Sequence, residues 1–216
     1  LAAIVDGNEE GARKIILELF LSGLSVAEIG DTVVSPAFQE IGLQWECGNL
    51  EVYRERRACE ITLHILAEVR QLLPLPPAHA PLAMGGAPQK DSYSLPTALI
   101  ELVFREAGWR TQSLGCQLPF DTLTAAALEY RPRLFWVSVS SEYDEDGFVE
   151  SCEGFRQSGP AETFVAVGGR ALQESTRRKM QYSAFGDNLK QLETLANSLK
   201  SPEVSSTNGH PRITNY

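Results

Sequence analysis

The stretch Asp91-Ser92-Tyr93-Ser94-Leu95-Pro96 lies between a short apolar run at residues 81–84 and a helix-like run at residues 95–107. A short apolar run, a turn and an amphipathic helix form the repeating unit of a parallel sheet. The same unit recurs toward the end of the chain. The expected strands are 81–84, 110–114, 134–138, 164–167 and 182–184, and the expected helices are 95–107, 120–130, 147–157, 170–179 and 188–199. This alternation predicts an α/β domain with a five-stranded parallel sheet covered on both faces, which binds ligands beyond the carboxyl ends of its strands.

The preceding part of the chain, residues 4–73, has the spacing of four helices. Asn8 can cap the first helix, and Ser25-Val26-Ala27-Glu28 is a capping-box pattern that opens the second. Pro36 suits the first turn of the third helix, and the fourth covers residues 52–73. Four helices with short connections predict an antiparallel bundle.

Four segments are therefore expected along the chain. Residues 1–73 form a helical-bundle cap domain, and residues 74–81 form a proline-rich linker. Residues 82–200 form the α/β domain. Residues 201–216 are polar, rich in Ser, Asn and Pro, and predicted to be a disordered tail.

Bulk composition narrows the function classes. The chain has 216 residues and a formal net charge of -9, which argues against this segment gripping nucleic acid by itself. Its four cysteines are scattered and lack zinc-site spacing. The sequence has no signal peptide and no apolar run long enough to cross a bilayer, which predicts a cytoplasmic protein without membrane contact. It also has no nucleophile elbow, phosphate-binding glycine loop or zinc helix, so we expect neither an enzyme nor a metal site.

Further motifs follow one another along the chain. Ile41-Gly42-Leu43-Gln44-Trp45-Glu46-Cys47-Gly48 ends the third helix, and nine residues separate Trp45 from the pair Glu55-Arg56. Trp109-Arg110-Thr111-Gln112-Ser113-Leu114-Gly115 contains the second strand. The third and fourth strands end in Ser138-Val139-Ser140 and Gly168-Gly169. In order and spacing, these segments resemble the cobalamin-binding domain family, in which a helical bundle precedes a flavodoxin/Rossmann-like domain.

The resemblance covers residues 1–199 and is closest in pattern to the effector regions of MerR-type, cobalamin-dependent, light-sensing transcriptional regulators. It implies a flat ligand clamped between the two domains. The implied cofactor-binding residues are Trp45, Glu55 and Arg56 above the ligand and Asp91, Tyr93, Ser138, Ser140, Gly168 and Gly169 below it.

Each of these residues also has a purely structural interpretation. Trp45 can be a core residue of its helix, and Gly168-Gly169 can be a tight turn between strand and helix. The serines can bond to backbone groups at the strand end, and Asp91 can cap a turn.

The chain departs from the family at the residues that bind cobalt. The family motif Asp-x-His-x-x-Gly has Tyr93 at its histidine position and Pro96 at its glycine position, and Arg56 replaces a second histidine. A neutral imidazole donates to a metal directly, whereas a phenol must first lose its proton. Arg56 instead adds a permanent charge, which can meet a propionate or pair with Glu60 one turn on.

The remaining histidines are His64 on the fourth helix, His79 in the linker and His210 in the tail. His64 is expected to be partly exposed. Of the three, it alone is placed where it could turn inward, for example as a haem ligand.

Three functions remain open. In the first, the chain is the ligand- or light-sensing effector region of a bacterial transcriptional regulator. It binds a cobalamin or another tetrapyrrole, such as a bilin or haem, without histidine ligation. In the second, it has lost its ligand and acts as an oligomerisation or antirepressor module. In the third, it is a corrinoid carrier for methyl transfer. For the regulator, the expected partners are other copies of the chain, and DNA through a DNA-binding domain outside this chain.

Overall fold

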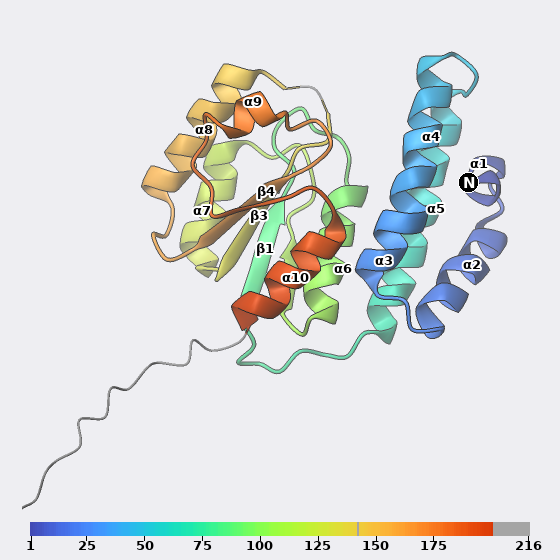
Figure 1. The fold of residues 1–216 in the computed structure, drawn as a ribbon, viewed down its shortest axis with the longest axis horizontal. Coiled ribbons are helices and arrows are strands. Elements are labelled where there is room, and N and C mark those ends of the chain that lie inside the picture. The colour runs from blue at the N-terminus through green and yellow to red at the C-terminus, as the bar shows by residue number, and fades with distance from the viewer. Residues whose placement is uncertain (142, 201–216) are drawn as a thin grey trace, which may run out of the picture.

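The chain folds into a helical region at residues 1–72 followed by a sheet region at residues 82–200, joined by a proline-rich segment (Figure 1). The computed structural model describes residues 1–141 and 143–200. The tail predicted at residues 201–216 lies outside the described residues. Across the described part of the chain, each helix is too short or too polar to cross a membrane.

The helical region confirms the predicted capping signals. Asn8 accepts a hydrogen bond from the backbone N–H of Gly11, and Ser25 and Glu28 form both bonds of a capping box. The elements are α1 (Ala2–Asp6), α2 (Glu9–Leu21), α3 (Val26–Ile29), the π-helix η1 (Gly30–Val34), α4 (Ser35–Glu46) and α5 (Val52–Leu72).

The predicted number of separate helices is wrong in two places. A short helix, α1, precedes the Asn8 cap, and α3, η1 and α4 run on without a break. A proline in a regular helix clashes with the carbonyl four residues earlier. The wider turn of η1 lies immediately before Pro36 and the first turn of α4, so the chain keeps its helical course through this point.

The sheet has five parallel strands in the order β2-β1-β3-β4-β5. Every residue of the central strand β3 is buried, as expected for a parallel strand covered on both faces. The strands are β1 (Leu82–Gly86), β2 (Arg110–Ser113), β3 (Leu134–Ser138), β4 (Phe164–Gly168) and β5 (Ala184–Gly186). Strand order reverses between β1 and β3, which is where such folds bind ligands.

Four long helices cover the sheet. In Figure 1, α6 (Leu95–Glu106) and α10 (Leu189–Lys200) lie on the face toward the helical region, and α7 (Phe120–Tyr130) and α8 (Glu145–Ser158) lie on the other. Side chains of β3 alternate accordingly, because Trp136 belongs to the core that continues into the helical region and Val137 to the core under α7 and α8.

The helix predicted at residues 170–179 is wrong in extent, since only α9 (Glu174–Arg177) forms. Gly169 has a φ of 114°, and the N–H of Ala171 bonds back to the carbonyl of Val139. The chain therefore makes a tight turn against the end of β3 before any helix can begin. The last strand also begins later than the predicted 182–184.

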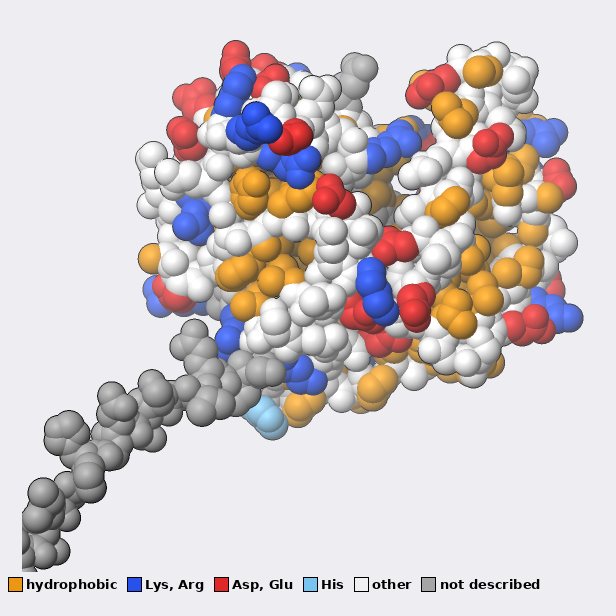
Figure 2. Space-filling model, viewed as in Figure 1, with side chains coloured by type: hydrophobic (Ala, Val, Ile, Leu, Met, Phe, Trp, Pro, Cys, Tyr) orange, Lys and Arg blue, Asp and Glu red, His pale blue; other side chains and the backbone are white. Residues whose placement is uncertain are grey.

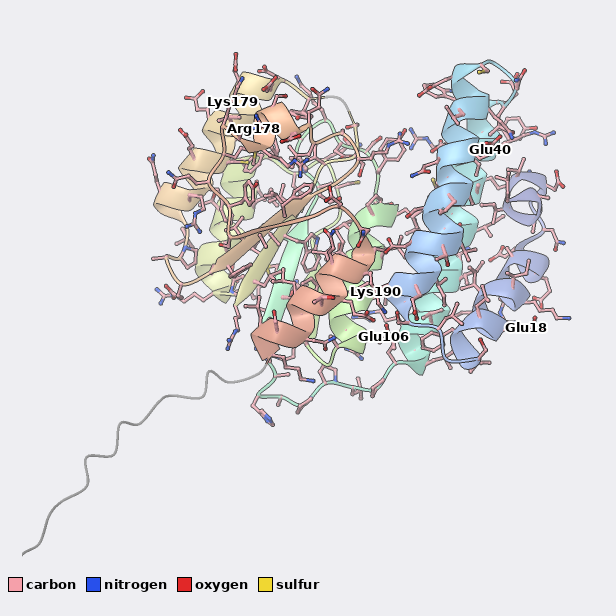
Figure 3. The ribbon with its side chains drawn as sticks, viewed as in Figure 1. Glu18, Glu40, Glu106, Arg178, Lys179 and Lys190 are labelled. Carbon is pink, nitrogen blue, oxygen red and sulfur yellow. The ribbon has the colours of Figure 1, made fainter. Side chains whose placement is uncertain are left out.

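Two carboxylates join the helical region to the sheet region. Glu106 of α6 accepts from the N–H of Val26 at 2.8 Å, at the start of α3. In return, Asp31 of η1 accepts from the N–H groups of Leu189 and Lys190, both at 3.0 Å, at the start of α10. Figure 3 shows Glu106 and Lys190 at this junction. Each region thus satisfies helix N–H groups of the other, which would otherwise lack partners.

We expect Asp31→Ala to lower the free energy of unfolding by about 1 kcal/mol, because it removes a carboxylate cap from α10. Urea denaturation measures the change. Asp6→Ala is the control, since Asp6 is exposed at the end of α1. Equal stability of the two variants would contradict the assigned role of Asp31.

Gly85 of β1 is required by close packing on Trp136. A Cβ at Gly85 would overlap the carbonyl oxygen and the indole ring of Trp136. Gly85→Ala is therefore expected to destabilise the fold by about 1–3 kcal/mol through overpacking. The same substitution at Gly154, an exposed α8 position with open space, is expected to stabilise by about 0.5–1 kcal/mol. Thermal or urea unfolding of the pair checks both signs.

Candidate cofactor-binding site

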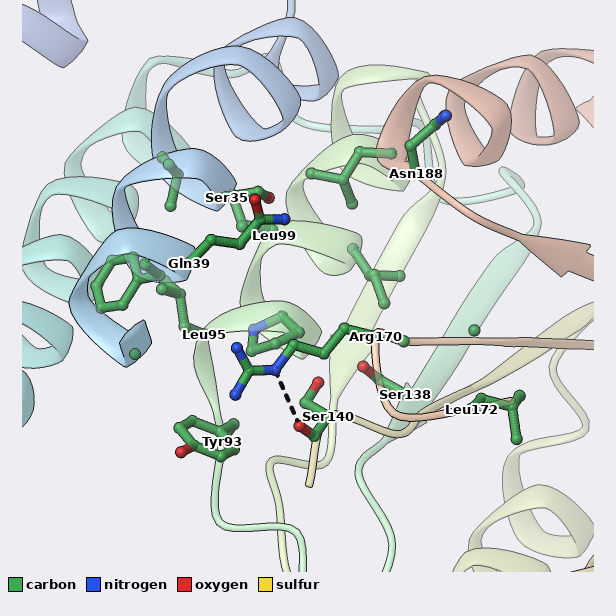
Figure 4. Close-up of a pocket in the computed structure, with 18 of the residues that line it drawn as sticks. Ser35, Gln39, Tyr93, Leu95, Leu99, Ser138, Ser140, Arg170, Leu172 and Asn188 are labelled. Atoms are coloured by element: carbon green, nitrogen blue, oxygen red, sulfur yellow. Dashed lines mark hydrogen bonds between the residues drawn. The ribbon is translucent and has the colours of Figure 1, made fainter. Parts of the chain in front are cut away.

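A cavity of about 710 Å³ lies between the helical region and the carboxyl ends of β3, β4 and β5. Helices α4 and α5 line it from one side, and α6 and the turns after the strands line it from the other (Figure 4). Figure 2 shows the surface hollowed between the two regions, with basic side chains at the upper end of the hollow. Its size is that of a small-molecule site.

The structure brings most of the predicted site residues together. Eight of the nine line the cavity, from both regions of the chain: Trp45, Glu55, Arg56, Tyr93, Ser138, Ser140, Gly168 and Gly169. Trp45 is about half exposed at the rim, so it is not a core residue of α4.

Asp91, the ninth, is buried beside the cavity and does not line it. Its carboxylate accepts from the N–H of Tyr93 at 3.0 Å and from the N–H of Ser140 at 2.5 Å. It therefore ties the loop after β1 to the loop after β3. Asp91 therefore has a structural task in this chain.

Asp91→Asn is expected to destabilise the chain by about 1–3 kcal/mol. The amide keeps one acceptor oxygen but turns an NH₂ donor toward one of the two N–H groups, leaving a buried donor unsatisfied. Urea denaturation is the measurement. The exposed Asp6→Asn is the control and should change stability by less than about 0.5 kcal/mol. A similar small change at Asp91 would disprove this role.

Backbone packing requires both glycines at the end of β4. A Cβ at Gly168 would lie 2.7 Å from the carbonyl oxygen of Gly186. At Gly169, a Cβ would overlap the carbonyl oxygen of Val139, and the positive φ disfavours other residues. The two glycines therefore form a tight turn, as their structural interpretation in the sequence predicted. This turn is also one wall of the cavity.

The two serines at the end of β3 supply polar groups to the cavity. Ser138 and Ser140 are both buried, and neither hydroxyl bonds to another of the residues that the structure describes. Buried hydroxyls usually have a partner. Both side chains line the cavity (Figure 4), so both hydroxyls are available to a ligand.

The deep end of the cavity is apolar and rigid. Trp136 forms part of its floor, and its Nε1 donates to the hydroxyl of Thr97 at 2.8 Å. The indole also stacks on Phe104, with ring centroids 6.1 Å apart. Sequence reasoning missed Trp136 as a lining residue, although it shares a face of β3 with Ser138 two residues later.

Tyr93 lies close to two arginines at the junction of the regions. The guanidinium carbon of Arg56 is 6.0 Å from the centroid of the Tyr93 ring, and that of Arg170 is 5.7 Å from it. Arg56 pairs with Glu55 at 3.3 Å and not with the expected Glu60. Arg170, which sequence reasoning also missed, follows directly after the Gly168-Gly169 turn.

Cys59 also lines the cavity, beside Glu55. Burial, and then the neighbouring Glu55 carboxylate, raise the pKa of the Cys59 thiol to about 12. The thiol therefore stays protonated near neutral pH and is a poor metal ligand and nucleophile.

The donor set does not fit a histidine-ligated cobalt. His64 is exposed on α5, with its Nδ1 3.2 Å from Glu9 Oε1, so the alternative in which it turns inward is wrong. His79 lies in the connecting segment away from the cavity, and His210 lies outside the described residues. Among the described residues, the cavity lining contains no imidazole. The lining supplies apolar side chains and free hydroxyls to an organic ligand, while the metal-ligand positions implied by the resemblance hold a phenol and a guanidinium.

Comparison with known proteins supports the resemblance to the cobalamin-binding domain family. Residues 1–70 match the family model described as a B12 binding domain. The HTH-type transcriptional repressor CarH of Myxococcus xanthus is 27% identical over 157 residues, which cover 72% of this chain and 52% of that protein. The chain thus spans about half the length of this curated relative.

Two solved structures share the fold. The Methanosarcina barkeri monomethylamine corrinoid protein superposes with a TM-score of 0.75 at 14% identity, covering 92% of this chain and 95% of that one. The methanol:cobalamin methyltransferase complex MtaBC from the same organism gives a TM-score of 0.50 at 14% identity, covering 92% of this chain and 76% of that chain. At this identity they show the fold alone.

These findings confirm the resemblance to the cobalamin-binding domain family. The N-terminal helices followed by a five-stranded parallel sheet are the architecture of the corrinoid protein. The similarity to the transcriptional repressor CarH is distant.

Proposed function

We propose that this chain is the effector region of a bacterial transcriptional regulator and binds a cobalamin or a related tetrapyrrole without a histidine ligand. The observation that carries the proposal is that the two regions line one cavity together. Trp45 lines it from the helical region and Ser138 from the sheet region. The similarity to a transcriptional repressor, although distant, supports the regulatory class.

A ligand in this position contacts both regions at once. Its binding therefore depends on how the two regions are arranged, and a ligand shifts a protein between arrangements by its differential affinity for them. In the proposed regulator, this shift changes the association of chains with one another. DNA is contacted through a separate DNA-binding domain, because the net charge of -9 opposes direct binding by this chain.

The chain's own residues supply binding and shielding rather than catalysis. Trp45 covers the ligand at the rim, and the Ser138 and Ser140 hydroxyls hydrogen-bond its polar groups. A non-enzymatic role is part of the proposal.

One observation favours a second candidate function. Both imidazole positions of the family are occupied by groups that do not bind cobalt, Tyr93 and Arg56, which is also expected if the site has lost its ligand. The chain would then act as a ligand-free oligomerisation or antirepressor module. A corrinoid carrier has less support, because the carrier proteins share the fold alone.

Ligand titration separates these candidates. The purified chain is mixed in the dark with adenosylcobalamin, haem or biliverdin, desalted, and measured by visible absorbance. At least one chromophore is expected to remain with the protein. A colourless protein after all three additions would refute ligand binding and leave the ligand-free module.

A cavity-blocking variant locates the bound chromophore. Gly42 of α4 lines the cavity, and a Cβ there would make only an ordinary 3.7 Å contact with Arg170. We expect Gly42→Trp to abolish chromophore retention because the indole fills the site. Gly154→Trp is the matched control, a helical glycine with open space outside the cavity lining, and it should retain the chromophore.

A further inference from the structure

We propose that the cavity recognises a free carboxylate of its ligand, held between Arg56 and Arg170 beside the Tyr93 ring. This inference rests on the proposed function and adds the chemical class of the ligand: a planar tetrapyrrole that carries free propionates.

The two guanidiniums approach Tyr93 from opposite walls of the cavity. Arg56 belongs to α5 in the helical region, and Arg170 belongs to the turn after β4 in the sheet region. Both lie within 6.0 Å of the same ring centroid. Figure 4 shows the Arg170 guanidinium above Tyr93, with its Nε directed to Ser140.

Arg170 is held in place by a backbone carbonyl and has no ion pair with any residue that the structure describes. Its Nε donates to the carbonyl oxygen of Ser140 at 3.3 Å, which fixes the side chain over the cavity. Among the described residues, no carboxylate lies within ion-pair distance of it. Arg56 uses Nε for Glu55, which leaves its two terminal NH₂ groups for another acceptor. Two cations near one ring repel each other, and an anion between them relieves that repulsion.

The other charged lining residues do not neutralise this pair. Asp31 caps the start of α10, and Asp187 pairs with Arg177 at 3.8 Å. Glu46 lies on α4 and is also without an ion pair to either arginine among the residues that the structure describes. Within the described part of the chain, Glu55 balances one of the two positive charges, and a ligand carboxylate would balance the other.

The chemistry of the pair selects among tetrapyrroles. A guanidinium donates two parallel hydrogen bonds to a carboxylate, and the Tyr93 hydroxyl is a further donor. Haem and bilins carry free propionates, whereas the corrin side chains of cobalamin are amides. We therefore expect the chain to prefer a propionate-bearing ligand over adenosylcobalamin.

The test compares biliverdin with its dimethyl ester, which has the same ring system without the charges. Fluorescence quenching and visible absorbance measure the affinities of the full chain. The free acid should bind about tenfold or more tightly than the ester, and salt should weaken only the acid. Adenosylcobalamin is titrated in parallel.

Two variants assign the effect to the arginines. Arg56→Gln and Arg170→Gln should each weaken binding of the free acid by about tenfold or more and leave ester binding nearly unchanged. Arg170→Lys should restore part of the loss. Arg54→Gln is the control, because Arg54 is on α5 outside the cavity lining and contacts Tyr53.

The outcomes are distinguishable. Equal binding of acid and ester, or binding of adenosylcobalamin alone, overturns the carboxylate inference and leaves the proposed function standing. Failure of these three compounds and of haem to bind overturns both. Loss of acid binding in Arg54→Gln equal to that in the cavity variants would show a nonspecific charge effect and also overturn the inference.

Discussion

The cavity depends on the contact that holds the helical region against one face of the sheet. Two buried surfaces and two carboxylates make this contact: α5 and α3 pack on α6, Glu106 caps α3, and Asp31 caps α10. Desolvation raises the pKa of Glu106, while its bond to Val26 opposes that shift. The junction therefore carries a partly buried charge that is tolerated because it satisfies helix N–H groups. A ligand that touches both walls adds to the same contact, so binding and domain arrangement are linked.

Much of the fold could be predicted from the sequence because local signals agree with the global structure. Strand β3 and helix α7 have the predicted ends, since an uninterrupted apolar run defines the first and Pro119 precedes the second. The predictions fail where distant contacts decide. The turn at residues 170–173 is fixed by a bond to Val139, and η1, which continues α3 into α4, packs on α10. Neither partner is visible in the local sequence.

The site shows the same division. The order and spacing of the sequence motifs correctly predicted eight residues of the cavity lining. This was possible because the fold fixes where the strands and α4 end. Asp91 instead accepts hydrogen bonds from two backbone N–H groups beside the cavity. The sequence did not predict Arg170 and Trp136 as lining residues. Arg170 reaches the cavity because Gly169 turns the chain and the Ser140 carbonyl accepts a hydrogen bond from its Nε–H. Neither contact can be read from the local sequence.

The residues of this site fall into two groups with different physical roles. Asp91, Gly168 and Gly169 hold backbone segments together, so the fold requires them whatever the ligand is. Tyr93, Arg56 and Arg170 satisfy no such requirement, and they are the groups that face the ligand space. The first group therefore fixes the shape of the site, while the second supplies its charged and polar side chains. In the proposed site, a phenol and a guanidinium stand at the two imidazole positions implied by the resemblance, and together with Arg170 they favour an anion over a metal ion.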